Sequence, residues 1–273
     1  MFTNNQKYLI SLDLDGTLLK SDKTISSKTI SYLQKLEKDG NIIVLNSGRA
    51  PRSIKIYYDL LKLVSPFIAY NGAYIHFNDS SLDLEYKFSQ KIIKYIYKSL
   101  FPKFISATIS ENNKEVFINT ENEIFNNFFN PMDLKVTKGE FTSILNDDVY
   151  TFLFEINEPV NENKELIKEF IHEIQGYEVR FWNSLNIGEI HLSNVNKACS
   201  LEKIAKICSV FDENILVFGD AENDVELFQN FKNSFIMLNG AEHIKSFAKF
   251  ITKKDNDHDG VIFEIENFLK TKV

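Results

Sequence analysis

The segment YLISLDLDGTLL, residues 8–19, is the most informative stretch of this chain. The apolar run Tyr8–Ile10 opens a predicted buried strand, and Asp13 and Asp15 stand where that strand ends. Open α/β sheets bind their ligands in the crevice outside the carboxyl ends of the strands, so these two carboxylates lie where chemistry is normally done. Gly16 then lets the backbone turn tightly and come close to a ligand.

Asp13 and Asp15 also have a purely structural interpretation. Aspartate favours turns and helix N-caps because its side chain hydrogen-bonds to nearby backbone groups. For an isolated Asp-x-Asp pair that interpretation would prevail. The rest of the chain therefore has to distinguish a turn from a reactive site.

Strand-like and helix-like segments alternate in the first part of the chain and again in the last. The predicted order is strand 8–13, helix 28–38, strand 41–46, helix 51–63 and strand 67–70, and later a helix from about 198, strand 215–219, helix 225–231, short strands 235–238 and 250–252, and a terminal helix. Near-continuous apolar strands such as residues 42–45 indicate a parallel sheet with helices on both faces.

The middle of the chain has a different character. Consecutive strand-like runs at 115–119, 149–156 and 177–182, with helix-like runs at 89–100 and 163–174, favour an α+β module. An insertion into one parallel-sheet domain explains this order better than two sequential domains. We therefore predict an α/β protein with a discontinuous core domain, residues 1–79 and 188–273, and an inserted domain, residues 80–187.

Composition excludes several classes of partner. The 273 residues are 44% hydrophobic, which allows a substantial core, and the net charge of −7 argues against a nucleic-acid-binding surface. No apolar run is long enough to span a membrane, and the first six residues are too short and polar for a signal peptide. We expect a soluble, cytoplasmic protein; the sequence leaves its oligomeric state open.

Two further polar segments follow predicted strands of the first half. Asn46-Ser47-Gly48-Arg49 follows strand 41–46, and a hydroxyl, a glycine and free amides before a helix make a phosphate cradle or, alternatively, a simple N-cap. Arg49 could bind substrate or pair with a neighbouring acid. Asn71-Gly72 is a hairpin turn signal by sequence alone.

Two more polar segments follow the insertion. Lys197 opens a predicted helix, where a lone lysine would normally be solvated. Gly219-Asp220-Ala221-Glu222-Asn223-Asp224 follows strand 215–219, and it places Asp220 and Asp224 about one helical turn apart. An acidic first turn can also serve only to complement the helix dipole.

The four aspartates together are stronger evidence for a reactive site than any one of them alone. Two carboxylates about 4 Å apart repel by about 4 kcal/mol at an effective dielectric of 20, so a cation must offset a cluster of them. Oxygen-only ligands and a phosphate substrate point to Mg²⁺ and not to zinc.

The segments Asp13–Leu18, Asn46–Arg49, Lys197 and Gly219–Asp224 occur in order, with the insertion between the second and the third. This layout resembles the Cof-type, C2-capped branch of the haloacid dehalogenase-like (HAD) phosphatases across essentially the whole chain. Ala198 stands where the family usually has glycine, a change that concerns packing more than charge. Asn239-Gly240-Ala241 departs modestly from the usual Asn-Ala pair, and Asp259-Gly260-Val261 matches a recurrent segment of this branch.

The resemblance implies a Rossmann-like core with a cap domain, and a Mg²⁺-dependent phosphatase acting through an aspartyl-phosphate. Asp13 would be the nucleophile and Asp15 the acid and then the base. The metal would be held by Asp13, the backbone carbonyl of Asp15 and Asp220, with Asp224 nearby. The predicted phosphate- and substrate-binding residues are Ser47, Gly48, Arg49, Asn71, Lys197 and Asn223.

The substrate class stays open among sugar phosphates, flavin or pyridoxal phosphates, and nucleotide monophosphates. A phosphotransferase or phosphomutase would use the same Asp13 intermediate but pass the phosphoryl group to a hydroxyl. A dehalogenase fits less well, because Asp15 and the metal pair suit phosphate. A noncatalytic metabolite-binding protein would bind Mg²⁺ and ligand without turnover.

Overall fold

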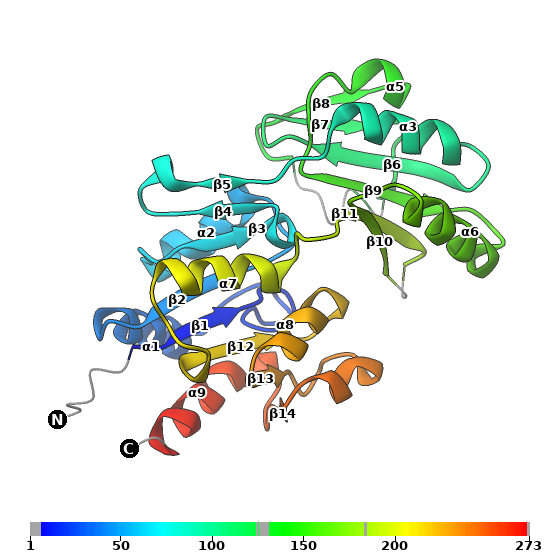
Figure 1. Ribbon diagram of the computed structural model, residues 1–273. Helices are drawn as coiled ribbons and strands as arrows, with labels where there is room; N and C mark the ends of the chain where they lie inside the picture. The colour runs from blue at the N-terminus through cyan, green and yellow to red at the C-terminus, as the bar shows by residue number, and fades with distance from the viewer. Residues whose placement is uncertain (1–6, 124, 126–130, 183–184, 272–273) are drawn as a thin grey trace. The chain divides into compact units, whose positions relative to one another are not determined.

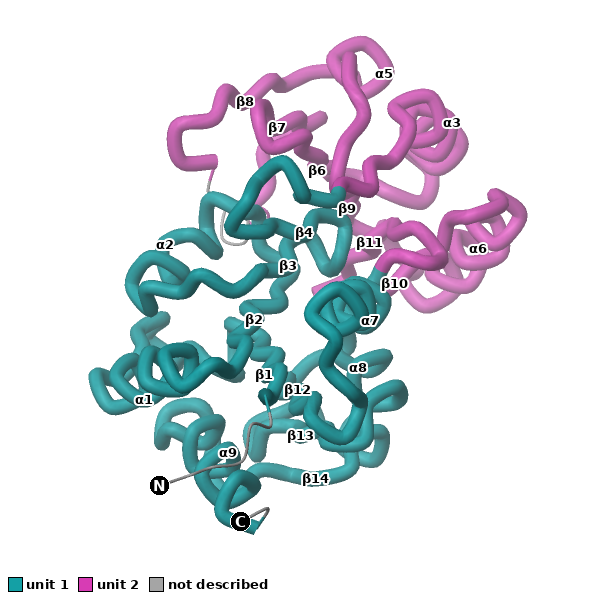
Figure 2. Tube along the Cα trace, turned by 60° about the vertical axis from the view of Figure 1, so that its left-hand side comes forward, with its two compact units in different colours: residues 1–84, 196–273 teal, residues 85–195 magenta. Residues whose placement is uncertain are grey.

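The computed structural model describes residues 7–123, 125, 131–182 and 185–271. The chain divides into two compact units, coloured separately in Figure 2: Met1–Leu84 together with Asn196–Val273, and Glu85–Val195. The first unit is therefore built from two stretches that are far apart in the sequence. Each unit has a sheet and a hydrophobic cluster of its own.

The first unit is organised around a sheet with strand order β14-β13-β12-β1-β2-β3-β4-β5 (Figure 1). Its elements are β1 (Leu9–Leu12), α1 (Ser27–Lys38), β2 (Ile42–Asn46), α2 (Pro51–Leu61), β3 (Phe67–Ala69), β4 (Tyr74–His76), β5 (Leu84–Glu85), α7 (Lys197–Ile207), β12 (Ile215–Gly219), α8 (Val225–Asn230), β13 (Asn233–Ile236), β14 (Phe250–Ile251) and α9 (Gly260–Thr271). The strands from β14 to β3 are parallel, and β3 and β4 form an antiparallel pair.

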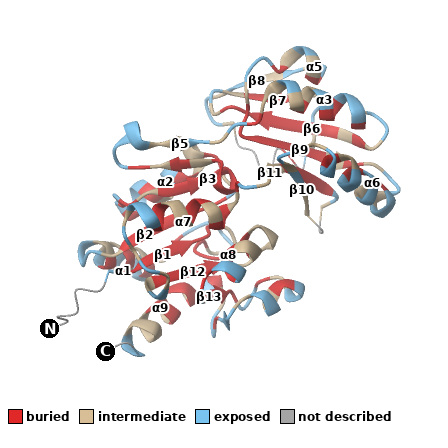
Figure 3. Ribbon diagram, viewed as in Figure 1, coloured by how far each residue is buried: buried red, intermediate tan, exposed pale blue. Residues whose placement is uncertain are grey.

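Helices cover both faces of this sheet, as near-continuous apolar strands require. α7 and α8 pack on one face through a buried cluster that includes Leu201, Ile204 and Leu227. Figure 2 shows α1, α2 and α9 on the other side of the sheet. All residues of β1, β2 and β12 are buried, as the red strands of Figure 3 show. The residues that follow the carboxyl ends of these strands are therefore attached directly to the buried centre of the sheet.

The second unit is an α+β module with strand order β10-β11-β9-β6-β7-β8. Its elements are α3 (Gln90–Leu100), β6 (Ile105–Glu111), β7 (Glu115–Ile118), β8 (Lys135–Lys138), α5 (Phe141–Ile144), β9 (Thr151–Ile156), α6 (Val160–His172), β10 (Tyr177–Trp182) and β11 (Ile187–Leu192). All its strand pairs are antiparallel except β7 with β8. A cluster rich in Phe and Ile joins the sheet to α3 and α6.

The expected α/β fold with an inserted α+β module is confirmed, with differences in detail. The predicted hairpin at Asn71-Gly72 is present, because β3 and β4 pair across it and Asn71 has a φ of 53°. The boundary near residue 188 lies too early. β11 pairs with both β9 and β10 and so belongs to the sheet of the second unit, which runs over Glu85–Val195.

Within the residues that the structure describes, no helix combines the length and the apolar character that a bilayer-spanning segment needs.

Candidate active site

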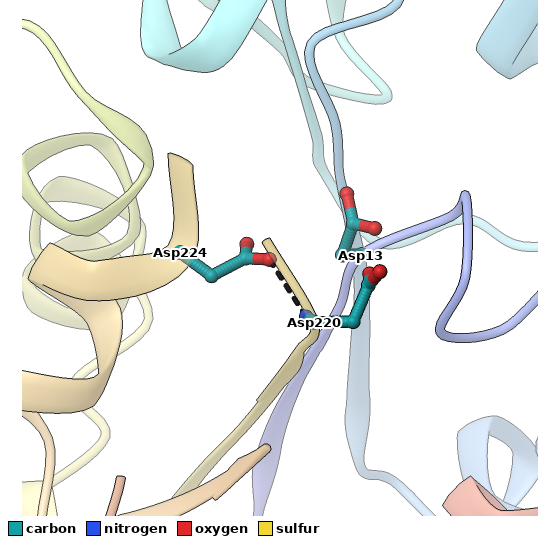
Figure 4. Close-up of side chains that lie close together, drawn as sticks. All are labelled: Asp13, Asp220 and Asp224. Carbon is teal, nitrogen blue, oxygen red and sulfur yellow. Dashed lines mark hydrogen bonds between the residues drawn. The ribbon is translucent and has the colours of Figure 1, made fainter. Parts of the chain in front are cut away.

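Two carboxylates follow neighbouring central strands at the same edge of the first sheet. β1 and β12 pair in parallel, with Leu12 opposite Phe218. Asp13 comes directly after β1, and Asp220 comes directly after β12. Figure 4 shows the two side chains close to each other. Asp13 is only 5% exposed, so its charge lies largely out of contact with solvent.

Asp224 joins them from a short turn that follows Gly219. Its Oδ2 accepts hydrogen bonds from the backbone N–H groups of Asp220 (2.9 Å) and Ala221 (3.2 Å). A side chain at position 219 would not fit, since a Cβ there would lie 2.3 Å from the Asp224 carboxyl carbon. Asp224 is fully buried and is fixed by the backbone of the segment that carries Asp220.

Lys197 is the cation of this cluster. It begins α7, and its Nζ donates to Asp13 Oδ1 at 2.6 Å and to Asp224 Oδ1 at 2.7 Å. The side chain is 0% exposed. Burial alone would lower the pKa of its ammonium group, but Asp13 and Asp224 reverse this and raise the pKa above its ordinary value. Lys197 therefore stays charged between the two carboxylates.

Gly16 and Thr17 shape the Asp220 side of the cluster. Gly16 has a φ of +74°, and a Cβ there would lie 2.3 Å from Asp220 Oδ2. Glycine is required both by this left-handed backbone and by the closeness of the carboxylate. Thr17 Oγ1 donates to Asp220 Oδ1 at 2.9 Å. The turn after β1 thus holds a carboxylate from β12.

Asp15 points to a different set of partners. Arg49 forms a two-pronged ion pair with it, Nε to Oδ2 at 2.6 Å and a terminal nitrogen to Oδ1 at 2.7 Å, and Lys23 Nζ lies 2.7 Å from Oδ1. Burial raises the pKa of Asp15, but Arg49 and then Lys23 outweigh burial, so the pKa lies below its ordinary value. Of the two roles open to Arg49, pairing with an acid is the one present here.

The segment after β2 forms a tight turn beside these groups. Ser47 is buried, and its Oγ accepts a hydrogen bond from the backbone N–H of Arg49 at 3.2 Å. A Cβ at Gly48 would lie 2.9 Å from Asn71 Oδ1. That same Oδ1 accepts a hydrogen bond from Asn223 Nδ2 at 2.9 Å. Asn71 thus connects the turn after β2 with the segment after β12.

The structure therefore brings the charged predicted residues into two groups, beside the turn of Ser47, Gly48, Asn71 and Asn223. Lys197 and three of the aspartates form one; Asp15 and Arg49 form an ion pair outside it. Thr17 and Lys23 were not among the predicted site residues. Thr17 had a usable signal, because a hydroxyl two residues after Asp15 lies in the same turn. Lys23 had none, since it belongs to an ordinary polar loop.

The donor set of the cluster fits a divalent cation. One oxygen from each of Asp13, Asp220 and Asp224 can be chosen so that all three lie within 4.8 Å of one another. Carboxylate oxygens are the ligands that hard cations such as Mg²⁺ prefer. Both oxygens of Asp224 already accept hydrogen bonds, from Lys197 and from backbone amides. Asp13 and Asp220 are therefore the better placed pair, with Asp224 behind them.

Burial, with charge repulsion added to it, raises the pKa of Asp13 and of Asp220. Burial raises the pKa of Asp13 well above its ordinary value; Lys197 opposes this, while Asp224 and Asp220 add to it. Burial and then the charge of Asp224 raise the pKa of Asp220 from 3.8 to about 7. One lysine does not neutralise three carboxylates, so the cluster favours a cation.

We expect Asp220→Asn to stabilise the protein in EDTA while weakening its binding of Mg²⁺. The unfolded chain loses the Asp220 proton near pH 4, whereas the folded chain keeps it until about pH 7. The free energy of unfolding therefore falls as the pH rises from about 4 to about 7, and Asp220→Asn removes this loss. At pH 8 the melting temperature should rise by at least about 3 °C, and the gain should shrink at pH 4. An unchanged or lower melting temperature at pH 8 would contradict a crowded acidic cluster.

Comparisons with known proteins agree with this geometry. A family model described as haloacid dehalogenase-like hydrolase matches residues 10–265. The chain is 32% identical over 259 residues to 5-amino-6-(5-phospho-D-ribitylamino)uracil phosphatase YitU of Bacillus subtilis, covering 93% of this chain and 94% of that protein. It is 28% identical over 265 residues to YcsE of Bacillus subtilis, which has the same enzyme name, covering 96% of this chain and 95% of that protein.

Solved structures are similar in fold. A haloacid dehalogenase-like hydrolase from Bacteroides thetaiotaomicron superposes with a TM-score of 0.79 at 22% identity, covering 96% of this chain and all of that one. SMU.1108c from Streptococcus mutans gives a TM-score of 0.81 at 20% identity, covering 97% of this chain and 100% of that one. The likeness extends over both compact units.

Proposed function

The chain belongs to the haloacid dehalogenase-like hydrolase family and is a phosphatase, and from this premise we propose that it hydrolyses small phosphorylated metabolites in a Mg²⁺-dependent reaction through an aspartyl-phosphate. The observation that carries the proposal is the buried contact of Lys197 with Asp13 and Asp224 beside Asp220. One lysine beside three carboxylates leaves an excess of negative charge, which a divalent cation would offset.

In this mechanism Asp13 attacks phosphorus and forms a new P–O bond while the bond to the leaving oxygen breaks. Its contact with Lys197 keeps one oxygen fixed, so the carboxylate presents the other in a constant direction. Lys197 also offsets negative charge that gathers on the phosphoryl oxygens. Water then attacks the aspartyl-phosphate, releases phosphate and restores Asp13.

Asp15 gives a proton to the leaving oxygen and then takes one from the attacking water. Arg49 and Lys23 favour its ionised form, which suits the second of these tasks. For the first task the ion pair has to loosen, and a phosphoryl group that draws Arg49 toward itself would do so. Arg49 then has two functions, pairing with Asp15 and binding the substrate.

Four further groups are proposed to hold the phosphoryl oxygens. Ser47 supplies a hydroxyl and Gly48 a backbone amide at the turn after β2. Asn223 has one Nδ2 hydrogen bonded to Asn71 and a second to offer to the substrate. Asn71 would contact the substrate or, through this bond, set the direction of the Asn223 amide. Positioning and charge stabilisation account for most of the expected rate gain.

Asp13, Asp220 and the backbone carbonyl of Asp15 are the groups we propose to hold Mg²⁺, with Asp224 fixing the cluster from behind. When bound, the ion supplies positive charge that offsets the carboxylates and polarises the phosphoryl group. Asp220 is restrained for this role by Thr17 and by the nearby Gly16 backbone.

The name of a similar protein suggests a first candidate substrate. YitU, at 32% identity over nearly the whole chain, is named for 5-amino-6-(5-phospho-D-ribitylamino)uracil, a phosphorylated sugar alcohol attached to a base. This compound is the first candidate within the wider class of sugar phosphates, flavin or pyridoxal phosphates and nucleotide monophosphates.

The test is release of inorganic phosphate from a panel of these compounds, with Mg²⁺ and with EDTA. We expect release from at least one compound and a fall of at least about 100-fold in EDTA. Release that stays small but requires a sugar bisphosphate would identify a phosphomutase instead. Binding of Mg²⁺ without turnover of any compound would favour a phosphomutase or a noncatalytic metabolite-binding protein.

A further inference from the structure

Two asparagines outside the carboxylate cluster hold the turn that carries Asp15 and Gly16. Asn239 follows β13, and its Nδ2 donates to the Gly16 carbonyl at 2.8 Å. Asn256 precedes α9, and its Nδ2 donates to the Leu19 carbonyl at 2.9 Å. The two asparagines are joined directly, since the Asn256 backbone N–H donates to Asn239 Oδ1 at 3.2 Å. One bonded pair thus holds the turn at its middle, Gly16, and at its end, Leu19.

The turn itself is closed by backbone hydrogen bonds. The N–H of Leu18 donates to the Asp13 carbonyl at 3.2 Å, and the N–H of Leu19 donates to the Leu14 carbonyl at 2.8 Å. These bonds fix how far the turn extends. The N–H of Thr17 donates to the Leu14 carbonyl at 3.3 Å and restrains the Gly16–Thr17 peptide from one side, and the shorter bond from Asn239 to the Gly16 carbonyl restrains it from the other.

The Gly16 carbonyl is coupled to Asp220 through a rigid group. The carbonyl of Gly16 and the N–H of Thr17 belong to one planar peptide, so a hydrogen bond to the former orients the latter. Thr17 Oγ1 then donates to Asp220 Oδ1 at 2.9 Å. The Gly16–Thr17 peptide thus links Asn239 to Asp220 through two hydrogen bonds.

The loop that carries Asn256 is fixed independently of the cluster. Asp259 Oδ1 accepts hydrogen bonds from Ser26 Oγ at 2.6 Å and Thr29 Oγ1 at 3.0 Å. A Cβ at Gly260 would lie 2.2 Å from the Lys254 carbonyl oxygen, so the start of α9 packs closely against the backbone of the preceding loop. Asn256 is only 8% exposed. The two unexplained sequence features, Asn239-Gly240 and Asp259-Gly260, thus belong to one support.

We propose that Asn239 and Asn256 are positioning residues that set the affinity of the carboxylate cluster for divalent cations. They hold the Gly16–Thr17 peptide so that Thr17 directs Asp220 toward Asp13. The proposal rests on the proposed function in one respect: it takes the cluster to be the metal site. Groups that orient a metal ligand through a hydrogen bond typically change affinity by about 10-fold to 100-fold when removed.

The experiment is a calorimetric titration with Mg²⁺, which needs no substrate and no turnover. We expect Asn239→Ala and Asn256→Ala each to raise the Kd for Mg²⁺ by about 10-fold. Asn233→Ala is the matched control, because Asn233 Nδ2 also donates to backbone carbonyls, those of Glu213 (3.1 Å) and Ile215 (3.0 Å), at the far end of β13. Its Kd for Mg²⁺ should match that of the wild type, whatever its melting temperature.

A double-mutant cycle tests the route through Thr17. Thr17→Val removes the hydroxyl whose hydrogen bond Asp220 accepts. This single substitution should also raise the Kd for Mg²⁺. If Asn239 acts through Thr17, the double variant should lose clearly less affinity than the product of the two single losses. Independent losses that multiply would overturn the route, and a Kd within twofold of wild type for both asparagine variants would overturn the proposal.

These outcomes are separate from failure of the proposed function. A wild-type protein that binds no Mg²⁺ would overturn the metal dependence itself. A wild-type protein that binds Mg²⁺ but releases no phosphate would overturn the proposed hydrolysis of small phosphorylated metabolites and leave the titration valid. Should Asn256→Ala not fold, Asn239→Ala and Thr17→Val suffice for the cycle, since Asn239 is exposed at the surface.

Discussion

Replacing Asp13 with Asn is expected to lower kcat for phosphate release by at least about 10⁴-fold, with little change in KM. The amide keeps the shape of the side chain but has no anionic oxygen to attack phosphorus. The fold should survive, because burial and the neighbouring acids already raise the pKa of Asp13, so removing its charge relieves repulsion. Phosphate release and the melting temperature in EDTA are the two measurements.

Asp22→Asn is the matched control for this variant. Asp22 lies in the loop after the same turn, is exposed, and bonds to Thr24. Its kcat should stay within about twofold of wild type. A second readout is covalent labelling of the protein by a substrate carrying radioactive phosphate, which Asp13→Asn should abolish. Activity of Asp13→Asn above one per cent of wild type would remove Asp13 from the role of nucleophile.

Lys197→Met is expected to lower the free energy of unfolding by about 3–5 kcal/mol at pH 7. Methionine has a similar length and helix propensity, so the main change is loss of the charge. Asp13 and Asp224 would then be buried without the cation that now bonds to both. Breaking a buried ion pair costs more than the pair gains, because a buried charge is left uncompensated. Urea denaturation in EDTA measures the loss.

Lys206→Met gives the comparison, since Lys206 is in the same helix but exposed. It should change the free energy of unfolding by no more than about 0.5 kcal/mol. Lowering the pH should restore part of the stability of Lys197→Met, because Asp13 can then bury its protonated form. A loss below about 1 kcal/mol at pH 7 would mean that Lys197 does not hold the cluster together.

The central strands were predictable because their burial shows in the sequence. β1, β2 and β12 are continuous apolar runs that end in polar residues, and Pro51 marks the first turn of α2. β8 was missed because its residues are mostly exposed and so carry no hydrophobic pattern. Strands of this kind are specified by their partner, here β7, and not by their own composition.

The sequence was sufficient to predict which polar residues follow the strand ends and form the site. Parallel strands bring their carboxyl ends to one edge, which is why Asp13 meets Asp220 and Asp224. Lys197 reaches them from the first residue of α7. The partner of Arg49 was not predictable, because it depends on where a long side chain finds a carboxylate in three dimensions. Ala198, which replaces the usual glycine, is fully buried against the sheet, in keeping with a change that concerns packing.

The place of β1 between β2 and β12 has a consequence for synthesis of the protein. Thr17 and Asp220 are 203 positions apart, and the whole second unit is made between them. A growing chain can pair β1 with β2 early, but its other neighbour leaves the ribosome only after residues 85–195, which have a core of their own and can fold first. Such distant pairing is slow, and it comes last. A growing chain that has not yet reached α7 therefore has Asp13 without Lys197, Asp220 or Asp224, and the proposed hydrolysis of phosphate esters becomes possible only when the sheet is complete.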